Sequence, residues 1–236
     1  MKAITHKYEK TYILHDEECA KEVTPEYFET AYWSKNGSVS AVGLGRGSAW
    51  FVSADALSLV LRHYKRGGMI ASISSDRYFW TGLERTRAWR EWNLLAYIQQ
   101  QGLPGPQPFA ARVVRHGLTY TADILTHRIE NSISLSSYLA ENKLSDEGWH
   151  LIGNCIHQFH KAHIYHADLN AHNVLLNQDG RVFVIDFDKG RIDCGESWQL
   201  KNLQRLKRSL DKLKKQISNY NFHEENWKYL EEGYKQ

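Results

Sequence analysis

Residues 165–190 read YHADLNAHNVLLNQDGRVFVIDFDKG, and this stretch places three polar residues at a spacing that decides the fold. Asn173 follows Asp168 by five residues, and Asp186 ends an apolar run 18 residues after Asp168. An Asp-Gly pair lies between two apolar runs, which is a strong signal for a β-hairpin. The hairpin is expected to return the chain so that Asp186 faces Asp168 and Asn173.

These three residues supply the groups that phosphoryl transfer to a hydroxyl requires. One carboxylate orients the hydroxyl and accepts its proton, while Mg²⁺ takes oxygen ligands from a second carboxylate and an amide. The pattern HxDxxxxN followed by a strand-terminal Asp is similar to the catalytic loop and DFG segment of protein kinases. We therefore predict that Asp168 meets the acceptor hydroxyl and that Asn173 and Asp186 bind Mg²⁺. Each acid alone is more often a turn cap, but the full spacing favours catalysis.

Segments that would hold a nucleotide come earlier in the chain, in the order of the same template. Three strands are predicted, the first ending near residue 42, the second starting near residue 49 and the third covering about residues 57–64. The first turn holds Gly43, Gly45 and Gly47. Their backbone N–H groups are candidates to cover the phosphates of ATP, although an ordinary hairpin turn explains the glycines equally well.

A cation for the donor phosphates is expected at the end of the third strand. Arg62 stands where the lysine of the VAIK pattern would fall, and Lys65 is the alternative three residues later. An arginine is a competent phosphate partner because its guanidinium forms a fork of donors. Glu91, on the following predicted helix, is the expected ion-pair partner of this cation. The alternative is a solvated glutamate on the helix surface.

The order of elements divides the chain into two lobes, because strands dominate first and helices later. The predicted fold is α+β and two-lobed, like that of protein kinases, with ATP in the cleft between a β-rich N-lobe and a helical C-lobe. The N-lobe is expected over residues 1–126, the hinge over 127–131 and the C-lobe over 132–236. In the C-lobe, Ser145 is a predicted helix cap, and leucines at steps of three and four predict a basic helix within residues 197–220.

Four motifs together resemble the Kdo kinase branch of the lipopolysaccharide kinases, namely LVLRHYKRGG, REWNLL, HADLNAHNVLL and IDFDKGR. The likeness extends from about residue 39 to residue 210. It implies ATP- and Mg²⁺-dependent phosphorylation of 3-deoxy-D-manno-octulosonic acid (Kdo) at its 4-hydroxyl, on the lipid A precursor Kdo-lipid IVA. It also implies a peripheral protein on the cytoplasmic face of the bacterial inner membrane.

Departures from protein kinases favour a glycolipid or small acceptor over a protein. Asp188 replaces the glycine of DFG, Asn170 stands where a lysine is usual, and no APE motif follows. A kinase for heptose or another small molecule is the alternative. A non-catalytic kinase-like binding module is more remote, because both acids and the asparagine of the motif are intact.

Cations near the predicted site are candidates to bind an anionic acceptor. They are Arg66, Lys189 and Arg191, for which surface charge is the alternative explanation. The predicted helix near the C-terminus carries seven basic residues and one acidic residue. It is expected to expose a solvated basic face, to rest on an anionic membrane surface, or to do both, because the leucines can pack inward while the lysines face lipid.

Composition argues against several other classes of protein. The formal net charge of +3 is too small to indicate a nucleic-acid partner, and no window approaches 18 uninterrupted apolar residues. The three cysteines are odd in number and far apart, so a disulfide framework is not expected. His157, His160 and His163 recur every three residues and do not form a zinc-binding HExxH pattern.

Overall fold

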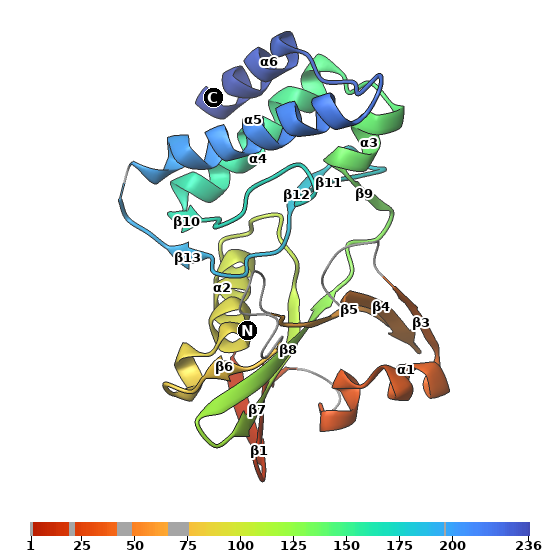
Figure 1. The fold of residues 1–236 in the computed structure, drawn as a ribbon, viewed down its shortest axis with the longest axis vertical. Coiled ribbons are helices and arrows are strands. Elements are labelled where there is room, and N and C mark those ends of the chain that lie inside the picture. The colour runs from red at the N-terminus through yellow and green to blue at the C-terminus, as the bar shows by residue number, and fades with distance from the viewer. Residues whose placement is uncertain (1, 19–21, 42–48, 66–75, 196) are drawn as a thin grey trace. The chain divides into compact units, whose positions relative to one another are not determined.

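The computed structural model of the 236-residue chain describes residues 2–18, 22–41, 49–65, 76–195 and 197–236. The chain forms two compact units (Figure 1). The first comprises Met1–Ala96 and Gln107–Arg128, and the second comprises Tyr97–Pro106 and Ile129–Gln236. Mixed α and β structure, with strands concentrated in the first unit and helices in the second, agrees with the predicted fold class.

An antiparallel sheet forms the first unit, with the strand order β1-β2-β7-β8-β5-β4-β3 and with β6 paired to β8. The strands are β1 (Ala3–Tyr8), β2 (Thr11–Asp16), β3 (Ser38–Ala41), β4 (Ala49–Ala54), β5 (Leu57–His63), β6 (Tyr78–Phe79), β7 (Pro108–His116) and β8 (Thr119–His127). The three strands predicted from alternation correspond to β3, β4 and β5, so this prediction is confirmed.

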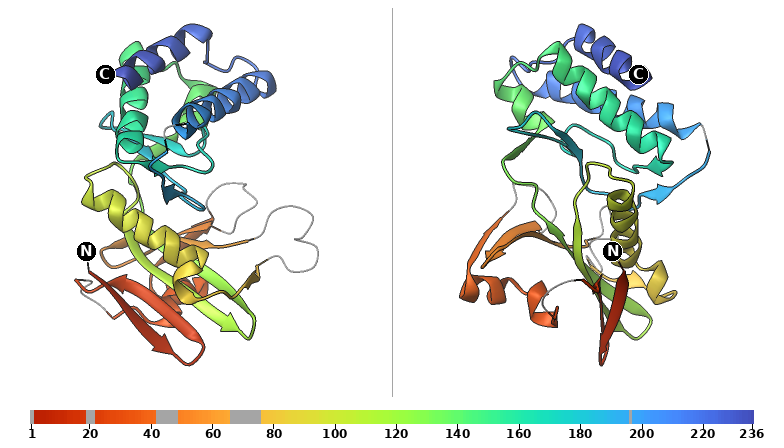
Figure 2. Two further views of the ribbon diagram at one scale, coloured as in Figure 1. Left: turned by 90° about the vertical axis from the view of Figure 1, so that its left-hand side faces the viewer. Right: turned by 180° about the vertical axis from the view of Figure 1, so that it is seen from behind.

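Two helices accompany this sheet, α1 (Thr30–Asn36) and α2 (Arg87–Gln100). Figure 2 shows α2 lying across one face of the sheet. At the start of α2, the backbone N–H of Arg87 donates to the hydroxyl of Tyr120 on β8 at 3.1 Å. Short 3-10 turns cover Pro25–Phe28 and Leu83–Arg85. The core is aliphatic and aromatic, and it includes the fully buried Trp33 and Leu59.

The second unit is mainly helical, with small sheets beside the helices. Its helices are α3 (Leu135–Glu141), α4 (Asp146–Lys161), α5 (Trp198–Gln216) and α6 (Glu224–Lys235). Its strands are β9 (Ser132–Ser134), β10 (Ile164–Tyr165), β11 (Val174–Asn177), β12 (Val182–Val184) and β13 (Arg191–Ile192). They pair as β12-β11-β9 and as β10-β13.

Two glycines let α4 and α6 approach each other closely. A Cβ atom on Gly153 would lie 2.0 Å from the carbonyl oxygen of Leu230, and one on Gly233 would lie 2.2 Å from that of His150. Figure 2 shows the two helices side by side. The predicted cap of α4 is confirmed, because the Ser145 hydroxyl accepts a bond from the backbone N–H of Gly148 at 3.1 Å.

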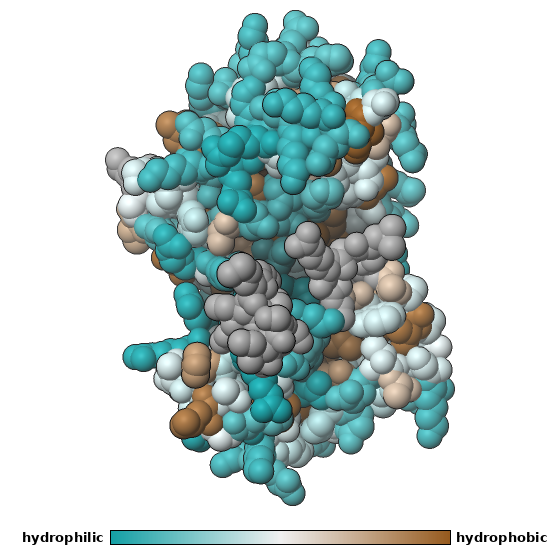
Figure 3. Space-filling model, viewed as in Figure 1, coloured by the Kyte–Doolittle hydropathy of each residue, from teal (hydrophilic) through white to brown (hydrophobic). Residues whose placement is uncertain are grey.

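Helix α5 confirms the predicted amphipathic pattern. Its inner face is formed by the buried side chains of Leu203, Leu206, Leu210 and Leu213. The exposed residues of the helix include Lys201, Arg205, Arg208, Lys212, Lys214 and Lys215. Figure 3 shows mainly hydrophilic side chains on the face of the second unit that carries α5. The leucine stripe therefore belongs to the core, and the basic residues face solvent.

The last turn of α2 and the residues that follow it, 97–106, group with the second unit. The sequence-based bounds had placed them in the N-lobe, residues 1–126. The backbone N–H of Val184 donates to the carbonyl of Pro104 at 3.0 Å, and Gly105 lies against the side chains of Ile98 and Phe187. These contacts attach the segment to the hairpin that precedes Asp186. None of the helices in the described part of the chain is long and apolar enough to cross a membrane.

Candidate active site

The loop from Asp168 to Asn173 connects β10 to β11 and is held by its own side-chain amides. The carbonyl oxygen of Asp168 accepts hydrogen bonds from the side chains of Asn170 and Asn173, each at 2.9 Å. The Asn170 amide oxygen also accepts a bond from the backbone N–H of His172 at 2.8 Å. Asn173 therefore restrains the loop through its NH₂ group, and its amide oxygen keeps the ability to bind a cation.

The predicted hairpin brings Asp186 back to Asn173. Strands β11 and β12 are antiparallel with Val174 opposite Val184, and the backbone N–H of Ile185 donates to the carbonyl of Asn173 at 2.9 Å. The hairpin turns at Asp179, whose backbone N–H donates to the Asn177 side chain at 3.1 Å. The expected return of the chain is confirmed for Asn173 and Asp186.

The backbone after β12 leaves the extended conformation abruptly. Asp186 and Lys189 have φ values of 63° and 62°, in the left-handed region that non-glycine residues rarely adopt. A bond of 2.7 Å from the N–H of Gly190 to the carbonyl of Phe187 closes the intervening turn. Backbone conformations of this kind are concentrated at ligand-binding and catalytic sites.

His166 forms hydrogen bonds to both segments that carry the predicted catalytic residues, the loop at Asp168 and the end of the hairpin before Asp186. Its Nδ1 atom accepts a bond from the backbone N–H of Asp168 at 3.1 Å, so Nε2 donates to the carbonyl of Ile185 at 2.9 Å. Burial lowers the pKa of His166, which favours this neutral tautomer. His166 therefore supports the loop through hydrogen bonds at both of its ring nitrogens.

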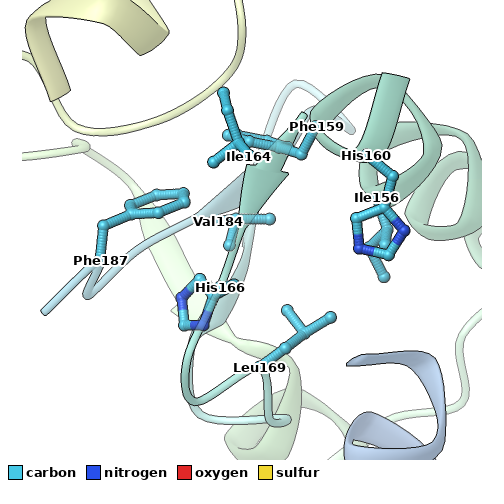
Figure 4. Close-up of a pocket in the computed structure, with 8 residues that line it drawn as sticks. All are labelled: Ile156, Phe159, His160, Ile164, His166, Leu169, Val184 and Phe187. Atoms are coloured by element: carbon cyan, nitrogen blue, oxygen red, sulfur yellow. The ribbon is translucent and has the colours of Figure 1, made fainter. Parts of the chain in front are cut away.

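Aromatic side chains pack around Phe187, the residue after Asp186. The ring of Phe187 lies 5.5 Å from that of Phe159 and 4.9 Å from that of His166, measured between ring centroids. Figure 4 shows these side chains around a small cavity of about 10 Å³, which is at the lower limit of the space that a single water needs. Because the lining is apolar, apart from two histidine rings, the position of Phe187 is fixed by packing.

Helix α5 also holds the catalytic loop and the residue His166 before it, through three polar side chains. The Asn202 amide donates to the carbonyl of His166 at 3.0 Å and accepts from its backbone N–H at 3.3 Å. The Arg205 guanidinium pairs with the Asp168 carboxylate, and the Ser209 hydroxyl accepts from the backbone N–H of Ala171 at 3.2 Å. None of these three contacts could be recognised from the sequence. The available signal was polar residues at steps of three and four beside the leucine stripe.

The first unit contains the predicted ion pair. The Arg62 guanidinium on β5 contacts the Glu91 carboxylate on α2, and Glu91 is only 4% exposed. The Tyr64 hydroxyl donates to the same carboxylate at 2.6 Å, a contact that the sequence did not reveal. Burial, and then the charge of Glu91, raise the pKa of Tyr64 well above its usual range. Glu91 is paired with Arg62, whereas Lys65 is exposed.

The remaining predicted site residues have separate surroundings. Lys189 is exposed, while Arg191 bonds to Asp193 at 2.7 Å and lies 4.1 Å from the centre of the Tyr165 ring. The glycine cluster of Gly43, Gly45 and Gly47 and the predicted acceptor cation Arg66 lie outside the described residues.

The donor set of the second unit fits Mg²⁺ better than a softer metal. Asn173 and Asp186 offer amide and carboxylate oxygens on neighbouring backbone positions, and hard cations bind such oxygens. Within the described ranges, no group of three or more His, Cys, Asp and Glu side chains could hold a metal ion. His160, one of the histidines weighed above as zinc ligands, is buried, and its Nδ1 contacts the Tyr234 hydroxyl at 2.8 Å.

Comparison with known proteins extends over most of the chain. A family model described as the lipopolysaccharide kinase (Kdo/WaaP) family matches residues 30–234. A 3-deoxy-D-manno-octulosonic acid kinase of Vibrio cholerae is 43% identical over 181 residues, 77% of each chain. The enzyme of that name from Actinobacillus succinogenes is 41% identical over 216 residues, 89% of this chain and 90% of the relative. That from Xylella fastidiosa is 44% identical over 207 residues, 87% and 82% of the two chains.

Proposed function

Because the chain belongs to the lipopolysaccharide kinase (Kdo/WaaP) family, we propose that it transfers a phosphoryl group from ATP to Kdo. The proposed acceptor is the Kdo residue of Kdo-lipid IVA, and the proposed position is its 4-hydroxyl. The observation that carries this proposal is the identity of about 40% to relatives named Kdo kinases, over most of each chain. The loop at Asp168 supplies the carboxylate that the proposed reaction needs to accept a proton from the acceptor hydroxyl.

The predicted residues at the centre of the site have separate roles in the proposed reaction. Asp168 orients the acceptor hydroxyl and accepts its proton, and the hydrogen bonds of Asn173 and His166 fix the backbone that carries it. Asn173 and Asp186 would hold Mg²⁺, which neutralises charge on the donor phosphates when bound. Arg62, restrained by the buried Glu91, would pair with those phosphates. Catalysis then depends mainly on positioning and charge neutralisation.

One assay tests the reaction and its acceptor together. The purified protein is incubated with radiolabelled ATP and either Kdo-lipid IVA or a glycolipid whose core carries heptose. Label on Kdo-lipid IVA alone, located at the 4-position by NMR of the product, supports the proposal. Label on the heptose alone would favour the alternative heptose kinase, and no label on either acceptor would reject both.

The acceptor's lipid also suggests where the protein works. We propose peripheral binding to the cytoplasmic face of the inner membrane through the exposed lysines of α5, since its leucines are buried. Each lysine near an anionic surface contributes about 1 kcal/mol. A Lys214→Glu/Lys215→Glu variant is therefore expected to bind anionic vesicles at least about tenfold more weakly in sedimentation, with its circular dichroism spectrum unchanged. Unchanged vesicle binding would eliminate this surface.

A further inference from the structure

An open pocket of about 370 Å³ lies beside Asp168 in the second unit. One side is formed by the loop residues Asp168, Asn170 and His172, and the other by Arg205, Arg208 and Lys212 of α5. The three basic residues follow each other at steps of three and four, so they share one face of the helix. The pocket thus combines the proposed catalytic carboxylate with three cations.

Two of these cations have no ion-pair partner in the part of the chain that the structure describes. Among the described residues, neither Arg208 nor Lys212 has an ion-pair partner, and both are exposed. By contrast, the ammonium group of Lys207 on the same helix contacts both carboxylate oxygens of Glu224, at 2.7 and 2.8 Å. The pocket therefore carries positive charge that an anionic ligand can neutralise.

Arg205 is arranged to bind a ligand while it contacts Asp168. Its Nε and Nη2 atoms both donate to the same oxygen of the Asp168 carboxylate. A guanidinium has five N–H donors, so three remain for a second anion. Arg205 can therefore join the Asp168 carboxylate to a negatively charged group in the pocket.

We propose that this pocket binds the carboxylate of the acceptor sugar, with Arg205, Arg208 and Lys212 as its partners. This inference rests on the proposed function, which puts the acceptor hydroxyl at Asp168. The carboxylate belongs to the same sugar as that hydroxyl, whereas the lipid phosphates are on other sugars. Of the acceptor's anionic groups, the carboxylate is therefore the one nearest the hydroxyl at Asp168. Arg208 and Lys212 are positioning residues that hold the sugar with its hydroxyl toward Asp168.

The test removes the two cations that do not contact Asp168. An Arg208→Gln/Lys212→Gln variant is expected to raise the KM for Kdo-lipid IVA by about tenfold or more, because charge-assisted hydrogen bonds are lost. The KM for ATP should not change. The control is Lys228→Gln/Lys235→Gln, which removes the same charge from exposed positions on α6 and should leave both KM values unchanged.

Simplified acceptors distinguish the carboxylate from the lipid phosphates. The methyl glycoside of Kdo has the carboxylate but no phosphate, and its carboxamide has neither. The double variant should weaken binding of the glycoside, measured by saturation-transfer NMR without ATP, and have no effect on the weaker binding of the carboxamide. A penalty seen only with the phosphorylated glycolipid would assign the cations to phosphate and overturn the proposal.

The same measurements separate this inference from the proposed function. If the unmodified protein transfers phosphate and the double variant has the same KM for Kdo-lipid IVA, the pocket assignment fails alone. If the unmodified protein binds the glycoside through these cations but transfers no phosphate, the proposed function fails and the pocket stands. Absence of both binding and transfer would overturn both.

Discussion

Asp168 is held in place through both its backbone and its side chain. Its backbone carbonyl is held by the amides of Asn170 and Asn173, and its carboxylate is held by Arg205. The first two partners are close in sequence and lie within the HxDxxxxN stretch, although the sequence did not predict these bonds. Arg205 is 37 residues away, and its contact could not be inferred from spacing.

Replacement of Asp168 tests the catalytic assignment directly. Asp168→Ala is expected to lower kcat by about 10²–10⁴-fold, because the group that accepts the hydroxyl proton is lost. Its thermal melting should remain cooperative, since the side chain is half exposed. Asp179→Ala, which alters only the hairpin turn, should retain activity; substantial turnover by the Asp168 variant would overturn the assignment.

Replacement of Glu91 tests the nucleotide-binding assignment. Glu91→Gln keeps the shape of the side chain but removes the charge that restrains Arg62, so the KM for ATP should rise by about tenfold. The variant should also lose about 1–3 kcal/mol of stability in urea unfolding, because a buried hydrogen-bonded charge pair is broken.

A control for this prediction comes from the same part of the chain. Glu84→Gln removes an exposed glutamate just before α2 and should change neither quantity. An unchanged KM for ATP in the Glu91 variant would contradict a role for Arg62 in holding the donor phosphates.

At the scale of elements, α5 joins the core to the catalytic loop. Its leucines pack inward, Asn202 contacts His166 just before the loop, and Arg205 and Ser209 contact Asp168 and Ala171 within it. The sequence predicted the helix and its buried stripe, because both depend on a period of 3.6 residues. It did not reveal the loop contacts, because periodicity does not identify the segment that lies opposite.

Asn202 is the contact whose loss should have the largest effect on stability. Asn202→Ala leaves the buried N–H and carbonyl of His166 without partners, which is expected to cost about 2–4 kcal/mol. Urea unfolding measures this loss, and kcat should fall as well because the loop is released. Gln204→Ala on the exposed face of α5 should be close to neutral. Equal stability of the two variants would show that Asn202 does not anchor the loop.

At the scale of the whole molecule, each unit has its own core, and the second contains a buried titratable histidine. Burial lowers the pKa of His160 to about 4. Its ring lies against Trp198 and Tyr234. A hydrogen bond with Asn202 raises this pKa and offsets part of the effect of burial, whereas the charges of His157 and His166 lower it further. The folded state therefore binds fewer protons than the unfolded chain between about pH 4 and pH 6.5.

This difference predicts how stability changes with pH. The contribution of His160 is complete above about pH 6.5 and is lost as pH falls toward 4, amounting to roughly 2–4 kcal/mol. Urea unfolding at pH 7, 6 and 5 should give a smaller pH dependence in His160→Asn than in the unmodified protein. His163→Asn is the matched control, because His163 is exposed and asparagine tolerates its φ of 59°. The idea fails if both variants retain the full pH dependence.

The sequence by itself determined the features that depend on neighbouring residues. These are the hairpin between Asn173 and Asp186, the cap at Ser145, the amphipathic pattern of α5 and the spacing of Asp168, Asn173 and Asp186. Turn preferences, helix periodicity and loop motifs are encoded within short stretches, so they can be recognised before the chain is folded. The family resemblance used the same local motifs.

Only the tertiary structure decided contacts between distant segments. It paired Glu91 with Arg62 rather than Lys65, across 29 residues, and added Tyr64 to the pair. It also grouped residues 97–106 with the second unit and brought Arg205 to Asp168. These outcomes depend on how helices and strands pack, because a side chain's partner is set by the segment that buries it and not by its sequence neighbours.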